Sequence, residues 1–169
     1  VPPDQIPNNA GRGLLLLGNG DGTFKPLPGQ ESGIRIYGEQ RGSALSDFNQ
    51  DGRIDLAVAQ NNDAIKLYQN MRAMPGLRVR LTGSKNNKNA IGAIIRIKYK
   101  SGWGPARLVS SGSGYWSQDS AVHVFSLQSK ADSIKIRWPN GQVVDYTLQD
   151  KFPSLDCSID QIKGIHWNI

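Results

Sequence analysis

Short apolar runs, interrupted at regular intervals by turn-forming residues, constrain the fold of this chain more than any other feature. The gaps between runs are rich in Gly, Asn and Pro, and Asn19-Gly20-Asp21-Gly22 is typical of a hairpin because Gly and Asn tolerate positive φ. No segment keeps a helical period over a window of about 11 residues, and the best short helix candidate is 158–163. This pattern predicts an all-β protein. The expected strands are 13–18, 23–27, 34–37, 44–47, 54–60, 64–68, 77–82, 90–100, 106–110, 122–127, 133–138 and 143–148.

Proline content and charge divide the chain into four parts. Residues 1–12 hold three prolines and no period, which predicts an extended N-terminal arm. Residues 1–70 contain 6 Lys/Arg and 8 Asp/Glu, whereas residues 71–148 contain 12 Lys/Arg and 3 Asp. Pro75-Gly76 marks the change. We therefore expect β domains at 13–70 and 71–148, followed by a C-terminal extension at 149–169.

Basic and apolar residues alternate within the second domain, at 78–81, 96–100 and 135–138. Such a pattern is typical of the solvent face of strands, where Lys and Arg discourage edge pairing, and it also suits an acidic glycan or another acidic partner. The chain lacks the aromatic-basic signature of an RNA-recognition motif, so we expect no nucleic acid partner. Its apolar runs are far below the ~20 residues that span a bilayer, so we expect no membrane span. Cys157, the single cysteine, has no partner for an intrachain disulfide.

The segment 47–55 carries the clearest chemistry. Its oxygen-bearing side chains stand at positions 1, 3, 5 and 9, Gly52 at position 6 permits a sharp turn, and position 7 offers a backbone carbonyl. Oxygen ligands at alternate positions wrap a hard cation, and this number of ligands suits Ca²⁺ better than Mg²⁺. Without a cation, each pair of carboxylates about 5 Å apart would repel by roughly 3 kcal/mol at an effective dielectric near 20. The predicted calcium ligands are Asp47, Asn49, Asp51, Arg53 (through its carbonyl) and Asp55.

Two alternatives to this calcium loop are excluded by the sequence. Position 12 is Val58 within a strand-like run, so the loop is not an EF-hand, which needs Glu there and flanking helices. His123 and His166 have no partners at metal-binding spacing, so no zinc site is expected.

Aromatic residues offer a second candidate site. Tyr115 and Trp116 lie in the Gly- and Ser-rich segment 110–120, where their rings could stack on a sugar or cap the core. Trp103, Trp138 and Trp167 are expected in the core or an interface. The chain has no Gly-x-Ser-x-Gly elbow and no nucleotide-binding glycine loop, so we expect no catalytic residues and no enzyme activity.

Two stretches also resemble known families. Residues 14–24 (LLLLGNGDGTF), 45–59 (LSDFNQDGRIDLAVA) and 65–70 (IKLYQN) together resemble one FG-GAP/VCBS-type repeat. That resemblance implies a propeller-type blade whose loop binds Ca²⁺ through the five residues named above. Residues 77–97, 110–120 and 134–142 resemble the ASPIC/UnbV domain, which follows such repeats and implies a small β-sandwich-like domain. The segment 125–127 reads Phe-Ser-Leu where that family usually has Phe-Gly-Leu.

These observations favour a non-catalytic, calcium-binding adhesion or interaction module that is extracellular or at the cell surface. The location follows from the resemblance, and a weak site with a Kd near ~10⁻⁴ M would be filled only outside cells. A propeller needs about 4–8 blades to protect its edges, so upstream blades of a longer chain or other copies of this chain must cover this one. In the second case the protein is a structural protomer that assembles through its sheet edges and N-terminal arm into a filament or sheath. A third hypothesis is a carbohydrate-binding part of an enzyme.

Overall fold

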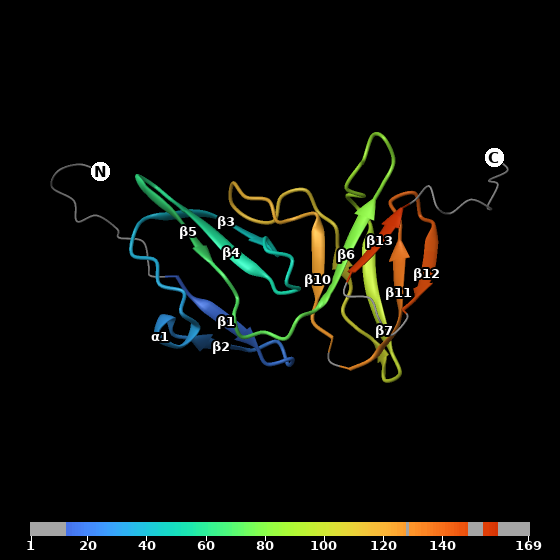
Figure 1. Ribbon diagram of the computed structural model, residues 1–169, viewed down its shortest axis with the longest axis horizontal. Helices are drawn as coiled ribbons and strands as arrows, with labels where there is room; N and C mark the ends of the chain where they lie inside the picture. Colours follow the sequence, from blue (N-terminus) through green and yellow to red (C-terminus); the bar gives the residue numbers. More distant parts are fainter. Residues whose placement is uncertain (1–12, 128, 149–153, 159–169) are drawn as a thin grey trace.

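The computed structural model describes residues 13–127, 129–148 and 154–158, and it is all-β, as predicted (Figure 1). The strands form two groups that lie end to end in the figure, β1–β5 on the left and β6–β13 on the right. No sheet in the described part of the chain shares strands between the two groups. The predicted arm 1–12 and the extension 149–169 lie outside the described residues, except for one strand at 154–158.

The first group contains a hairpin and a separate sheet. Strands β1 (Leu15–Gly18) and β2 (Phe24–Leu27) pair antiparallel, and the N–H of Asn19 donates to the carbonyl of Thr23 at 3.0 Å. Gly20 and Gly22 have φ of 86° and 89°, so the predicted hairpin and its physical reason are confirmed. One helical turn, α1 (Gly29–Ser32), follows, and then β3 (Gln40–Ser46), β4 (Asp55–Gln60) and β5 (Asp63–Tyr68) form an antiparallel sheet in that order.

The strand predicted at 34–37 is wrong, although its central residue is buried. Ile36 is only 1% exposed, so the apolar pattern reflects burial and not sheet pairing. The hydroxyl of Tyr68 accepts from the N–H of Arg35 at 3.2 Å and donates to the carbonyl of Arg35 at 2.7 Å. A side chain of β5 therefore satisfies the backbone groups that a neighbouring strand would have paired.

The second group is a two-layer sandwich, which confirms the predicted sandwich-like architecture. One layer has the order β10-β6-β13, from β6 (Leu77–Thr82), β10 (Val122–Phe125) and β13 (Ser154–Ser158), with β13 parallel to β6. The other has the order β12-β11-β7-β8, with β9 also paired to β7. Its strands are β7 (Ile94–Tyr99), β8 (Gly102–Trp103), β9 (Arg107–Leu108), β11 (Ala131–Arg137) and β12 (Val143–Thr147).

The core of the molecule lies between these two layers. Alternation along each strand turns one row of apolar side chains inward, and Trp138 closes the cluster directly after β11. Trp138 is therefore in the core, as predicted, whereas Trp103 is partly exposed. The strand predicted from residue 90 begins only at Ile94, because Ala90 has φ of 52° and forms a turn. The core residues include Leu77, Val79, Leu81, Ile95, Ile97, Phe125, Ile134, Ile136 and Trp138.

The single helix in the described part of the chain, α1, has four residues and is too short to cross a membrane.

Candidate functional site

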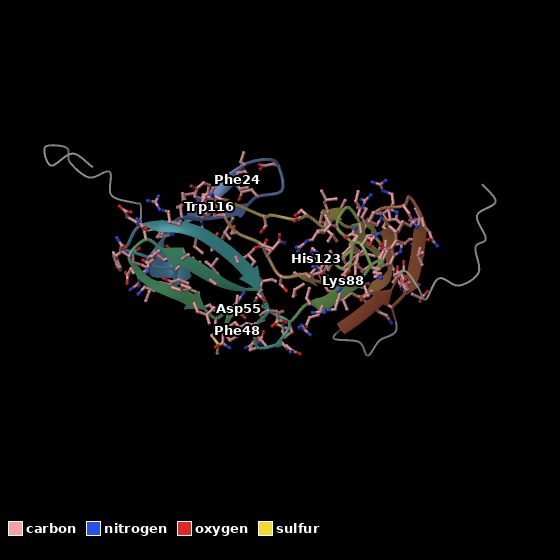
Figure 2. All side chains as sticks on the ribbon, turned by 90° about the horizontal axis from the view of Figure 1, so that it is seen from above. Phe24, Phe48, Asp55, Lys88, Trp116 and His123 are labelled. Carbon is pink, nitrogen blue, oxygen red and sulfur yellow. The ribbon has the colours of Figure 1, made fainter. Side chains whose placement is uncertain are left out.

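The Asp-rich loop 47–55 connects β3 to β4 and lies where the two groups of strands meet (Figure 2). Register pairing of Ser46 with Asp55 brings the two ends of the loop together. Asp47 and Asp55 are 6% and 2% exposed, although acidic residues are rarely buried unless they are paired. Both side chains therefore point into the molecule, as the predicted ligand set requires.

Asp47 organises the first half of the loop. Its Oδ1 accepts from the N–H of Asp51 and its Oδ2 from the N–H of Gly52, both at 2.9 Å. Oδ2 also accepts from Nε of Arg78 at 2.7 Å, and the Asp47 side chain in this ion pair is fully buried. Arg78 belongs to β6, where alternation places Val79 in the core and Arg78 on the opposite face. A single carboxylate thus folds the loop and connects it to the second group of strands.

Asp51 lies on the exposed side of the loop. Its Oδ1 accepts from the N–H of Arg53 at 2.9 Å, and its Oδ2 accepts from Nδ2 of Asn49 at 2.9 Å and Nη1 of Arg53 at 3.0 Å. The hydrogen bond from Asn49 is the largest factor that lowers the pKa of Asp51, and the backbone and guanidinium of Arg53 lower it further. This carboxylate is therefore ionised at neutral pH.

Asp55 is the most deeply buried acid of the loop. Its Oδ1 accepts from the N–H of Asn70 at 2.8 Å and its Oδ2 from the N–H of Phe48 at 3.3 Å. Within residues 13–127 and 129–148, no salt bridge reaches Asp55. A buried carboxylate that receives backbone hydrogen bonds without a paired cation is costly, because desolvation disfavours its charge.

The sequence predicted strong mutual repulsion among these three acids in the absence of a cation. The structure shows that the chain itself supplies compensation, since Arg78 pairs with Asp47 and Arg53 pairs with Asp51. Among the described residues, no three Asp, Glu, His or Cys side chains converge closely enough to hold a metal ion in the arrangement seen here. Asp55 is therefore the loop acid whose charge is least compensated within the described part of the chain.

The residues nevertheless fit a hard divalent cation chemically. The loop offers three carboxylates, the amide oxygen of Asn49 and the carbonyl of Arg53, all of the oxygen class that Ca²⁺ takes. The two hydrogen bonds that Oδ2 of Asp51 accepts from Asn49 and Arg53 would be exchanged for the ion. The predicted ligand set stays a prediction, with its first and last carboxylates already buried at the two ends of the loop.

The loop also contacts the linker to the second group. The N–H of Gly76 donates to the carbonyl of Gly52 at 2.7 Å, and Nε of Arg53 donates to the carbonyl of Ala73 at 2.7 Å. Gly52 has φ of 79°, and a Cβ there would lie 3.1 Å from the carbonyl oxygen of Gly76. Glycine is therefore required for both the turn and the close approach. The roles of Arg78 and Gly76 were not predicted from the sequence, although the alternation of β6 could have placed Arg78 outside the core.

The segment 110–120, which we call the aromatic loop because it contains Tyr115 and Trp116, lies along the edge strand β3. Leu45 donates its N–H to Oδ1 of Asp119 at 2.8 Å, and its carbonyl accepts from the N–H of Ser120 at 2.9 Å. Tyr115 and Trp116 are 68% and 89% exposed, with ring centroids 6.0 Å apart. The alternative that these rings cap the core is therefore wrong, and a ligand-binding role for them stays a prediction.

A cavity of about 440 Å³ is lined by residues of 110–120, by Ile54 of the Asp-rich loop and by His123, which Figure 2 labels. Burial is the largest factor that lowers the pKa of His123; Arg107 lowers it further and Asp119 opposes the shift. His123 is therefore neutral at pH 7. None of the residues that line this cavity was predicted from the sequence to be a site residue.

Comparison with known proteins adds evidence for the second group of strands. A stretch of 73 residues is 33% identical to Cartilage acidic protein 1 of Xenopus tropicalis; it covers 43% of this chain and 11% of that relative. The chain thus matches only a small part of the relative's length. The FG-GAP/VCBS-type resemblance of residues 14–70 stays a prediction. Residues 83–150 match the ASPIC and UnbV family, which confirms the resemblance expected for the second domain.

Proposed function

We propose that this chain is a non-catalytic binding module of an extracellular or cell-surface protein, and that its Asp-rich loop holds a structural Ca²⁺. The similarity of a 73-residue stretch to a protein named for cartilage supports the location. The ASPIC and UnbV match supports a role outside catalysis. The observation that carries the calcium proposal is Asp55, a carboxylate 2% exposed and hydrogen-bonded to two backbone N–H groups, at the end of a loop of oxygen donors.

In this proposal the ion stabilises the junction of the two groups of strands. Its ligands would be Asp47, Asn49, Asp51, Asp55 and the carbonyl of Arg53. The loop already contacts the second group through Arg78 and the linker through Gly76. Bound Ca²⁺ would neutralise Asp55 and fix the loop from which these contacts arise, so binding should stabilise the folded protein.

The first prediction concerns thermal stability. Calcium at 100 times its Kd should stabilise the folded state by about 2.7 kcal/mol, and EGTA should remove this stabilisation. Differential scanning calorimetry with excess Ca²⁺, with excess Mg²⁺ and with EGTA measures the effect. The melting temperature should be highest in Ca²⁺, lower in Mg²⁺ and lowest in EGTA. Identical melting curves in all three buffers would contradict a structural calcium ion.

A second candidate function, assembly with other copies or with upstream blades, is favoured by exposed apolar side chains in the first group. The hairpin exposes Leu14, Leu16 and Phe24, and β5 exposes Ile65 and Leu67, each by 48% or more. The hairpin and β5 thus each expose apolar side chains, which is typical of surfaces that another protein covers. Because β5 is an edge strand of the three-stranded sheet and no further strand pairs with it in the described part of the chain, strand addition by a second copy is a physical route to a filament.

The second prediction distinguishes assembly with other copies of this chain from contact with upstream blades. If copies of this chain cover the exposed side chains of β5, sedimentation velocity at rising concentration should show growing oligomers, and Ile65→Glu with Leu67→Glu should abolish them. Lys66→Glu, at an exposed position on the opposite face of the same strand, serves as the control and should leave assembly intact. A wild-type chain that stays monomeric at high concentration with Ca²⁺ present excludes self-assembly and leaves upstream blades as the cover.

A further inference from the structure

The outer face of the five-stranded sheet is unusually basic. On β7 Ile95 and Ile97 point into the core, and on β11 Ile134 and Ile136 do so, which turns the residues between them outward. Lys135 stands opposite Arg96 in the register, and β11 lies between β7 and β12 (Figure 1). The outward cations of these two strands are Arg96, Lys98, Lys135 and Arg137. We call this set, together with Trp103, the basic face.

Three of these cations gather around one indole ring. The Nζ of Lys135 lies 4.5 Å from the centroid of Trp103, and the charged groups of Lys98 and Arg96 lie at 5.6 Å and 5.7 Å. The Nε of Arg96 also donates to the carbonyl of Gly104 at 3.0 Å, which fixes the guanidinium beside the ring. The ring quadrupole attracts each cation, and this attraction offsets part of the repulsion between them.

The basic face keeps most of its charge. Asp145 of β12 pairs with Lys135 at 3.6 Å, but the two side chains are 55% and 38% exposed, so this ion pair contributes little. Three positive groups held around one ring form a preorganised site for several negative groups at once. The chain as a whole concentrates its cations in this half, with 12 Lys/Arg and 3 Asp in residues 71–148.

We propose that the basic face binds a sulfated or carboxylated polysaccharide. Neighbouring strands are about 4.8 Å apart and alternate residues about 7 Å apart, so the cations form a row that an extended polyanion can follow. Single-stranded nucleic acid is a poorer fit, because it is usually held by several aromatic rings that stack on successive bases, whereas here one ring is covered by cations. The proposal deepens the binding role proposed above but does not depend on the Asp-rich loop, whose residues lie in the other group of strands.

The test uses a fluorescent heparin oligosaccharide and measures its affinity by anisotropy in EGTA. The variant Lys98→Gln with Lys135→Gln removes two cations beside Trp103 and should weaken binding about tenfold or more, because two charged contacts are lost. The control Lys25→Gln with Lys66→Gln removes the same charge from exposed positions in the first group and should change the affinity less than about twofold. Binding should also weaken steeply with added salt.

Three results would overturn the proposal. Equal losses in the two double variants would show that general charge attraction, and not the basic face, holds the glycan. Single-stranded DNA or poly-glutamate of equal charge binding more tightly than heparin would assign the face to another class of polyanion. An unchanged anisotropy at low salt would exclude the interaction altogether. Because EGTA is present throughout, heparin binding and calcium binding fail independently, and each failure is recognisable.

Discussion

Replacement of Asp47 by alanine is expected to lower the free energy of unfolding by about 3–5 kcal/mol. The Asp47 side chain is fully buried, and its loss leaves the Arg78 guanidinium without its partner. The N–H groups of Asp51 and Gly52 also lose the acceptor around which the loop folds. Urea denaturation in EGTA measures this effect without any contribution from a bound ion.

Glu39→Ala is the matched control, because it removes an acid from an exposed ion pair with Arg41 and should cost about 1 kcal/mol or less. A second variant, Asp47→Ala with Arg78→Met, should recover part of the loss, since it also removes the unpaired cation. If Asp47→Ala costs no more than Glu39→Ala, the junction does not depend on the buried pair.

Trp138→Ala is the change expected to damage the second group of strands most. Trp138 is 1% exposed and packs against the isoleucines of β7 and β11, so truncation leaves a large cavity and should cost about 3–5 kcal/mol. The free energy of unfolding from urea titrations measures the loss. Trp138→Phe should fold even where alanine does not, with a smaller loss that keeps the comparison possible.

The chain provides a control of the same residue type. Trp116 is 89% exposed, so Trp116→Ala should change the free energy of unfolding by about 0.5 kcal/mol or less. Similar losses at the two positions would show that the core does not lie between the two layers.

Local sequence rules predicted most of the strands because they depend on alternation and turn chemistry. The hairpin at Gly20 and Gly22 required positive φ, and the inward rows of β7 and β11 followed from the spacing of their isoleucines. The same rules failed where tertiary contacts decide the structure. Ile36 is buried without strand pairing because the Tyr68 hydroxyl occupies the backbone of Arg35, a contact 33 residues away in sequence.

In the candidate site, too, some features follow from local sequence spacing and others from tertiary contacts. The positions of the oxygen donors in 47–55 follow from spacing alone, and burial of Asp47 and Asp55 agrees with inward-pointing ligands. The arginines that pair with Asp47 and Asp51 could not be predicted equally well. Arg53 is within the loop, but Arg78 reaches Asp47 only because the two groups of strands meet at that point. Charge counts predicted a basic second domain, yet only the pairing of β7, β8 and β11 collects three cations around Trp103.

Calcium titration by isothermal calorimetry tests the central claim, that the Asp-rich loop binds Ca²⁺, through two variants expected to act in opposite directions. Asp51→Asn replaces a carboxylate ligand on the exposed side of the loop by a neutral amide and should weaken binding at least about tenfold, the loss of roughly 1.4 kcal/mol. Arg53→Gln keeps the carbonyl but removes the guanidinium that competes for Oδ2 of Asp51, so it should bind Ca²⁺ at least as tightly as the wild type. A wild-type protein that releases no binding heat and keeps its spectrum on addition of millimolar Ca²⁺, or an Asp51→Asn variant with unchanged affinity, would contradict the assignment.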